Sequence, residues 1–173
     1  GGSLLPDGAQ GGRLDLLKGC LARGMPADLR WRPSSQTPLY EAASHRHAEV
    51  VEELLRAGAD VRATSLRAEV TALHAVASAS SQYDDERAAT ARIVDLLLAR
   101  GLTIDVRDGR GQTPLHAACH LDDVVVAAIL LAHGASCDAR DADGRTPVEV
   151  LHAEPRERRE ALRALLATAS RRR

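Results

Sequence analysis

Paired apolar residues recur along the chain at the spacing of one face of an α-helix. Val50 and Val51 are followed four residues later by Leu54 and Leu55, and the stretches 93–98 and 126–131 repeat this pattern. Because residues i and i+4 lie on the same side of a helix, each stretch predicts a helix with one buried stripe. A glycine follows each apolar run, as expected where a helix closes in a left-handed cap. These glycines are Gly24, Gly58, Gly101 and Gly134.

A shorter helix is predicted ahead of the paired apolar runs. It opens with threonine, usually followed by proline and then an aliphatic residue. Threonine can cap a helix N-terminus, and proline at the first helical position loses no needed donor. We expect the aliphatic residue to point into the core. The four motifs are Thr37-Pro38-Leu39-Tyr40, Thr71-Ala72-Leu73-His74, Thr113-Pro114-Leu115-His116 and Thr146-Pro147-Val148-Glu149.

The spacing of these motifs shows that one unit is repeated. The threonines are 34 (37 to 71), 42 (71 to 113) and 33 (113 to 146) residues apart. The glycines give nearly the same intervals, 34 (24 to 58), 43 (58 to 101) and 33 (101 to 134). The unit is therefore 33 residues long, with an insertion of about nine residues in the repeat that begins at Thr71. Such a period is typical of a solenoid, in which each repeat buries its apolar face against its neighbours.

The repeat resembles the ankyrin repeat, a 33-residue unit of a turn and two helices with the signature T-P-L-H-x-A. Thr113-Pro114-Leu115-His116-Ala117-Ala118 carries the resemblance, which covers residues 4–170. It implies one all-α domain of stacked helix-turn-helix pairs joined by β-hairpin-like loops. The expected units are 4–36 (degenerate), 37–70, 71–112 with the insertion at about 81–89, 113–145, and 146–170 as a charged C-terminal cap. Residues 1–3, Gly-Gly-Ser, look like a cloning remnant.

Composition favours an aliphatic core in an intracellular protein. Aromatic residues make up 2% of the chain, phenylalanine is absent, and the formal net charge is -1. We therefore expect no binding to nucleic acid or to a membrane surface. Cys20, Cys119 and Cys137 are too far apart for a disulfide framework or a Cys-x-x-Cys metal pair. This favours the cytoplasm or the nucleus, as does the lack of a signal peptide or a long apolar span.

The sequence shows no pattern typical of a catalytic or metal-binding site. The ankyrin resemblance implies that His74 and His116 tie neighbouring repeats by hydrogen bonds. Cys119 stands beside His120, but its place among small core residues indicates a buried structural thiol rather than a nucleophile. Phosphate-binding loops, His-Glu-x-x-His and Gly-x-Ser-x-Gly are missing. We expect no enzyme activity, cofactor, metal or small-molecule substrate.

The insertion leaves two interpretations open. Asp84, Asp85 and Glu86 precede an alanine-rich stretch, which predicts a longer second helix because acidic residues stabilise a helix N-terminus. Alternatively, the insertion is an accessory contact for a partner, with Tyr83 as its anchor.

The resemblance also implies a partner surface on the concave side, at the hairpin tips and the exposed positions of each first helix. Trp31 either anchors a partner there or folds back over the weak first repeat. Four hairpin arginines are expected to reach outward, which favours an acidic partner segment. The alternative is a solvated surface without a partner. The expected contact residues are Trp31, Gln36, Glu41, Ser44, His45, Arg67, Ser78, Arg107, Arg110, Gln112, His120, Arg140, Asp143 and Arg145.

The predicted function is a non-catalytic adaptor or scaffold that binds another protein. Two alternatives remain. The chain is somewhat similar to the ankyrin portion of ankyrin and SOCS-box proteins, which implies the substrate receptor of a cullin-type ubiquitin ligase. It could also be the targeting domain of a larger enzyme. The residues that carry the SOCS-box similarity are Thr37-Pro38-Leu39-Tyr40, Ala72-Leu73-His74-Ala75-Val76-Ala77 and Gly144-Arg145-Thr146-Pro147-Val148-Glu149.

Overall fold

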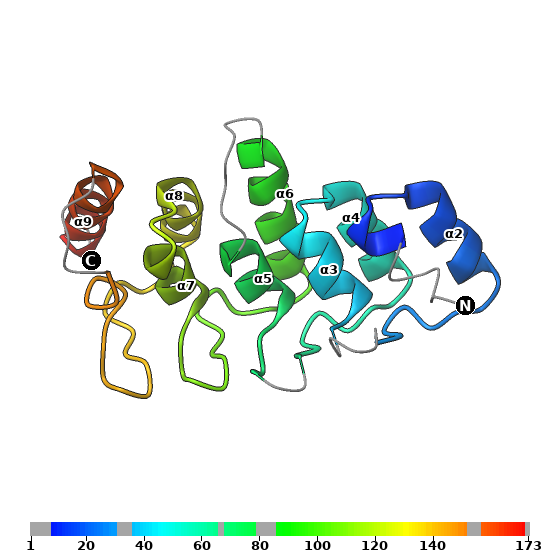
Figure 1. Cartoon of the computed structure of the whole chain (residues 1–173), viewed down its shortest axis with the longest axis horizontal. Helices are drawn as coiled ribbons and strands as arrows, with labels where there is room; N and C mark the ends of the chain where they lie inside the picture. Colours follow the sequence, from blue (N-terminus) through cyan, green and yellow to red (C-terminus); the bar gives the residue numbers. More distant parts are fainter. Residues whose placement is uncertain (1–7, 31–35, 66–67, 79–85, 152–156, 172–173) are drawn as a thin grey trace.

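The computed structural model of the chain describes residues 8–30, 36–65, 68–78, 86–151 and 157–171. Its helices stand in two rows along one axis, and loops project from one side of the rows (Figure 1). Regular structure in these residues is entirely helical, which confirms the predicted all-α solenoid. The first row holds α3 (Pro38–Ser44), α5 (Ala72–Ser78) and α7 (Pro114–His120), and the second holds α2 (Leu14–Ala22), α4 (Ala48–Arg56), α6 (Glu86–Ala99), α8 (Val124–Ala132) and α9 (Glu157–Ser170).

Threonine and proline start the first-row helices as predicted. Thr37 caps α3 by accepting a hydrogen bond from the backbone N–H of Tyr40 at 3.1 Å, and Pro38 is the first helical residue. Thr113 and His116 form a reciprocal capping box at the start of α7. Each threonine satisfies a backbone donor that has no partner within its helix. These short helices are therefore capped by residues of their own repeat.

Glycine ends the second-row helices in the left-handed conformation. Gly58, Gly101 and Gly134 have φ of 88°, 86° and 87°. At the end of α8 the N–H of Gly134 bonds the carbonyl of Leu131, and that of Ala135 bonds the carbonyl of Leu130, both at 3.0 Å. The glycines thus let the chain leave the helix while its last carbonyls keep their partners.

The core is one continuous aliphatic seam between the two rows. Leu39, Leu73 and Leu115 are at most 1% exposed, as predicted for the motif position. Val148 at the same position is 40% exposed, so the prediction that it joins the core is wrong. The reason is local, because residues 147–150 form turns instead of a helix that would direct Val148 inward.

The insertion lengthens the second helix of its repeat. Helix α6 has 14 residues, against nine in α4 and in α8, which confirms the longer helix. Its additional first turn lies beside Arg46, whose Nε donates to Oε2 of Glu86 at 2.8 Å. Tyr83, the alternative anchor for a partner, lies outside the described residues.

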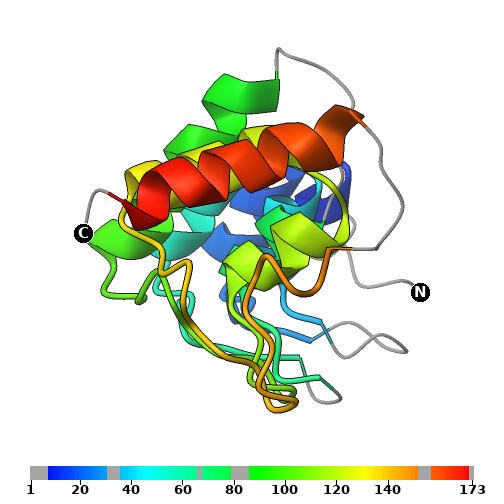
Figure 2. The same cartoon turned by 90° about the vertical axis from the view of Figure 1, so that its left-hand side faces the viewer.

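Helix α9 covers α8 at the end of the second row (Figures 1 and 2). Leu162 and Leu166 face inward, whereas Glu160 and Arg163 are exposed. Arg159 is buried and donates from Nε to both carboxylate oxygens of Asp122, at 2.9 and 3.0 Å. This polar outer face is what the end of a solenoid requires. Among the described helices, none combines the length and apolar character needed to cross a bilayer.

A matched pair of glycine substitutions tests the cap. We expect Gly134→Ala to destabilise the fold by about 1–2 kcal/mol, because a Cβ there would meet no atom within 4 Å but the residue must keep φ near 87°. Gly19→Ala should instead stabilise it by about 0.5–1 kcal/mol, because Gly19 lies inside α2 with equally open space. Urea unfolding of both variants measures the effects. Shifts of the same sign would contradict the assignment of the cap.

Candidate functional site

The connections between repeats lie on one side of the molecule (Figure 2) and follow one another along its long axis as a row of hairpins (Figure 1). An aspartate braces each of the last two hairpins. Asp108 Oδ1 accepts from the N–H groups of Arg110 and Gln112 at 2.9 and 2.8 Å. Asp141 Oδ1 accepts from those of Asp143 and Arg145 at 3.0 and 2.9 Å. These carboxylates therefore hold the turns and are occupied within the chain.

Neighbouring hairpins are bonded to one another through their backbones. The N–H of Gly109 donates to the carbonyl of Ala68 at 3.0 Å, and the N–H of Ala142 donates to the carbonyl of Arg110 at 2.9 Å. Each of the last two hairpins is thus bonded to the hairpin that precedes it.

Two buried histidines tie the first helices α5 and α7 to the hairpins that follow them. His74 Nε2 lies 3.0 Å from the carbonyl of Gln112, and His116 Nε2 lies 3.0 Å from the carbonyl of Arg145. The N–H of Thr113 points at His116 Nδ1 from 3.1 Å, which places the imidazole proton on Nε2. Burial lowers the pKa of both histidines. The predicted role of these residues in joining repeats is confirmed.

Glu149 takes over half of the histidine's role in the last repeat. Its Oε2 accepts from the N–H of Thr146 at 2.7 Å and from the Thr146 hydroxyl at 2.9 Å. These bonds lower the pKa of Glu149. A carboxylate can cap the threonine in this way, but it has no proton to donate to a further hairpin.

The residues predicted to contact a partner differ in accessibility. Glu41 is a correction to that prediction, since it is only 9% exposed, and burial raises its pKa despite the opposing effect of His45. Trp31 and Arg67 lie outside the described residues. Gln36, Ser44 and Gln112 are half-buried, and the exposed members are His45, Ser78, Arg107, Arg110, His120, Arg140, Asp143 and Arg145.

The hairpin arginines are less free than their sequence positions suggest. Arg107 Nη1 donates to the carbonyls of Gly111 and Arg140 at 2.7 and 2.5 Å. Arg140 Nη1 donates to the carbonyl of Gly144 at 2.6 Å. Arg145 binds Oδ2 of Asp141 through Nε and Nη2, and Asp143 through Nη2. These three arginines are exposed, but nearby turn carbonyls and carboxylates accept some of their hydrogen bonds, which the sequence did not predict.

Asp141 is the most strongly perturbed carboxylate of the hairpins. Burial opposes its ionisation, but bonds from the Arg145 backbone, the Arg145 side chain and Gln112 outweigh burial and lower its pKa to about 2. Asp141 and Arg145 therefore form a pair that stays ionised at neutral pH. The charge of Arg145 is largely balanced by Asp141 and Asp143 of its own hairpin.

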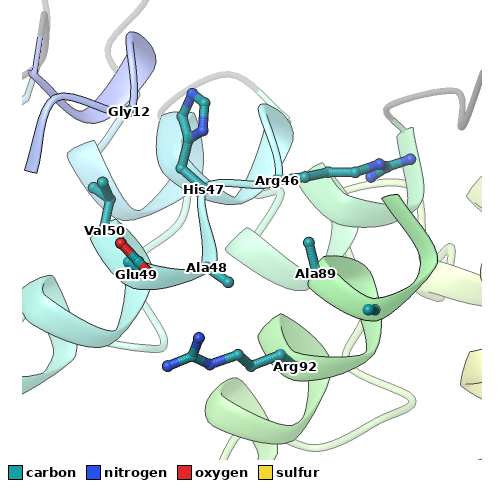
Figure 3. Close-up of a pocket in the computed structure, with 9 residues that line it drawn as sticks. Gly12, Arg46, His47, Ala48, Glu49, Val50, Ala89 and Arg92 are labelled. Carbon is teal, nitrogen blue, oxygen red and sulfur yellow. The ribbon is translucent and has the colours of Figure 1, made fainter. Parts of the chain in front are cut away.

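A groove of about 480 Å³ lies between α4 and α6, at the step made by the additional turn of α6 (Figure 3). Arg46 and Arg92 border it, and Arg92 extends from α6 toward α4. Both guanidiniums are paired within the chain, Arg46 with Glu86 and Arg92 with Glu52 at 2.5 Å. Among the described residues, none of those predicted to contact a partner lines this groove.

A charged network in the helix-to-helix turns was not predicted from the sequence. Arg46 has a side chain only 6% exposed, and besides Glu86 it lies 3.9 Å from Asp123 of a later repeat. Arg46 and Asp122 occupy the same turn position with φ of 57° and 56°. The sequence signal for this network was a charged residue at the same turn position in two repeats, Arg46 and Asp122.

The cysteines are unpaired and buried. Burial, together with the charges of the nearby Cys137 and Asp122, raises the pKa of Cys119 to about 12. A thiol that holds its proton so firmly is a poor nucleophile. In the part of the chain that the structure describes, no group of three or more His, Cys, Asp or Glu is placed to hold a metal.

Comparison with known proteins identifies the repeat. A family model for three copies of the ankyrin repeat matches residues 86–171, and a model for a single ankyrin repeat matches residues 35–66. The Caenorhabditis elegans ankyrin repeat and KH domain-containing protein mask-1 is 36% identical over 118 residues, which are 67% of this chain and 4% of that protein. Human ankyrin repeat domain-containing protein 17 and human ankyrin repeat and KH domain-containing protein 1 are each 38% identical over 78 residues, 45% of this chain and 3% of each relative. The chain therefore spans a small part of the length of these relatives.

Replacing His116 tests the tie between repeats. We expect His116→Ala to lower the free energy of unfolding at neutral pH by about 2–4 kcal/mol, because Arg145 and Thr113 lose partners and a cavity remains. Since burial lowers the pKa of His116, the unfolded chain binds a proton near pH 6.5 before the folded chain does. The stabilisation is complete above about pH 6.5 and falls below it. Urea unfolding should show the difference from wild type narrowing toward pH 5.

His133 is a matched control, because its contribution to stability should depend on pH in the opposite direction. Its Nδ1 and Nε2 lie 2.8 Å from the carbonyl of Ile129 and 2.8 Å from Asp95 Oδ1, and these acceptors raise its pKa. Its stabilisation is complete below about pH 6.5 and is lost as the pH rises through its folded pKa. The difference between wild type and His133→Ala should thus widen on acidification. A His116→Ala difference that also widens would rule out a neutral, proton-donating His116.

Proposed function

Because this chain belongs to the ankyrin repeat family, we propose that it is a non-catalytic interaction module that binds another protein across its hairpins and first helices. Ankyrin repeats in general serve as protein-binding modules. The observation that carries the proposal is the row of hairpins, the last three of which are bonded to one another and carry exposed side chains from successive repeats (Figure 1). A surface ordered in advance loses little conformational entropy when a partner binds.

The charge of the hairpins favours a partner segment with acidic character. The carboxylates of Asp108 and Asp141 accept hydrogen bonds from backbone N–H groups of the turns. Arg107, Arg110 and Arg140 are exposed. No described residue accepts a hydrogen bond from the Arg110 guanidinium, and among the donors of Arg110 only the backbone N–H is bonded, to Asp108. The surface between the turns is therefore richer in available donors than in acceptors, which suits carboxylates.

We propose that the module works in the cytoplasm or nucleus, because its three cysteines are unpaired and a reducing environment keeps them so. Adaptor or scaffold is the role that fits a module of this kind. The ubiquitin-ligase and enzyme-targeting alternatives stay predictions from the sequence.

Charge reversal in the hairpins tests the proposed surface. We expect the double variant Arg107→Glu, Arg110→Glu to lose the proteins that the wild-type chain captures from cell extract, with at least about a tenfold drop in affinity for a captured partner. The affinity of the wild type should also fall as salt is raised.

The control is Arg13→Glu, Arg87→Glu, which changes the net charge equally at exposed positions of the first unit and of α6. It should capture the same proteins as wild type. Equal capture by the hairpin variant and wild type, with little salt dependence, would move the binding site away from the hairpins.

A further inference from the structure

We propose that Arg107 and Arg140 act together as a ruler that binds two carboxylates about 8–10 Å apart on an extended segment of the partner. This inference rests on the proposed function, and it adds the spacing that the partner must have. It follows from the way in which these two side chains are anchored.

The two guanidiniums are held in equivalent positions. Arg107 and Arg140 occupy the same place in consecutive 33-residue repeats. Each donates from Nη1 to the glycine carbonyl four residues later, Arg107 to Gly111 at 2.7 Å and Arg140 to Gly144 at 2.6 Å. Because donor atom and acceptor correspond, the translation that relates the repeats also relates the two guanidiniums.

The anchored side chains keep donors available for a ligand. Only Nη1 of each guanidinium is used, and no described residue accepts from Nε or Nη2 of Arg107 or Arg140. The side chain of Arg140 is 65% exposed. An arginine fixed through one nitrogen presents its other edge in a defined direction, so a carboxylate can be bound by two parallel bonds at a reduced entropic cost.

The neighbouring charges favour Arg107 and Arg140, rather than Arg145, as the residues that bind the carboxylates of the ligand. Arg145 is neutralised by Asp141 and Asp143, at 3.0 and 2.5 Å. Glu149 Oε2 lies 3.8 Å from Arg140, but on the Nη1 side that the turn already uses, and it is also held by Thr146. Arg110 lies between the two anchored arginines in the sequence and adds positive charge.

The repeat translation sets the spacing of the ligand groups. Helices in contact pack about 8–10 Å apart, and this distance is the step from one repeat to the next. A polyproline-type segment has three residues per turn and rises about 3.1 Å per residue, so residues i and i+3 lie on one face about 9 Å apart. Acidic residues at i and i+3 of such a segment match the two guanidiniums, whereas adjacent acidic residues reach only one of them.

Peptide titrations of the full chain test the spacing. One peptide carries glutamates at i and i+3 in a proline frame (Glu-Pro-Pro-Glu), and its isomer carries them side by side (Pro-Glu-Glu-Pro). The Nε–Hε NMR signals of Arg107 and Arg140 should both shift with the spaced peptide, which should bind about three- to fivefold more tightly than the isomer at low salt. Arg107→Gln and Arg140→Gln should each abolish this preference, and Arg87→Gln should leave it intact.

The wild-type preference is decisive even if a variant folds poorly. Equal affinity for the two peptides would overturn the ruler while leaving the proposed function intact, since that function is tested by capture with the charge-reversed hairpins. Tighter binding of a single-stranded oligouridylate than of the spaced peptide would also overturn it, because the hairpins would then select phosphates.

Discussion

The burial of aliphatic side chains between neighbouring helix pairs is the interaction on which every other feature of this molecule depends. Helices α3, α5 and α7 have seven residues each and α4 and α8 have nine, lengths at which an isolated helix is marginal in water. Their stability comes from side chains such as Leu39, Leu73 and Leu115, which are buried against the next repeat. With few aromatic residues, the seam is built from leucine, valine, isoleucine and alanine, and close packing of short helices replaces large individual contacts.

Polar groups fix how the stacked pairs are oriented. On the hairpin side, His74 and His116 bond the following loops while their threonines cap the helices, so one imidazole serves two repeats. In the helix-to-helix turns, Arg46 contacts Glu86 and Asp123, and Arg159 grips Asp122. The two hairpins that end at Gln112 and Arg145 are therefore each bonded to the helix of the preceding repeat. The proposed binding of carboxylates by Arg107 and Arg140 depends on such bonds, because an arginine held through one nitrogen has its remaining donors in a set direction.

The departures from the repeat are concentrated where the regular pattern cannot continue. Helix α6 begins a turn earlier than its neighbours, which buries Thr90 at the position where His47 and Asp123 start α4 and α8. Thr90 Oγ1 has no hydrogen-bond partner among the described residues. At the last repeat, Glu149 keeps the capping function of histidine, and Val148 lies partly in solvent. The array thus tolerates a lengthened helix and an altered end without loss of its aliphatic seam.

Residue spacing alone predicts the repeat, its helices, the threonine caps, the glycine ends and the inward-facing leucines. Each of these depends on contacts within one repeat or on a period that recurs, so residue spacing records them. The folded arrangement of the repeats was needed to show which charged side chains are bonded within the molecule. The burial of Glu41, the anchoring of Arg107 and Arg140 on turn carbonyls, and the reach of Arg46 to Asp123 depend on rotamers of long side chains and on the approach of groups from different repeats. Spacing along the chain does not record such distances, because one arginine position can face either solvent or the carbonyl of the next hairpin.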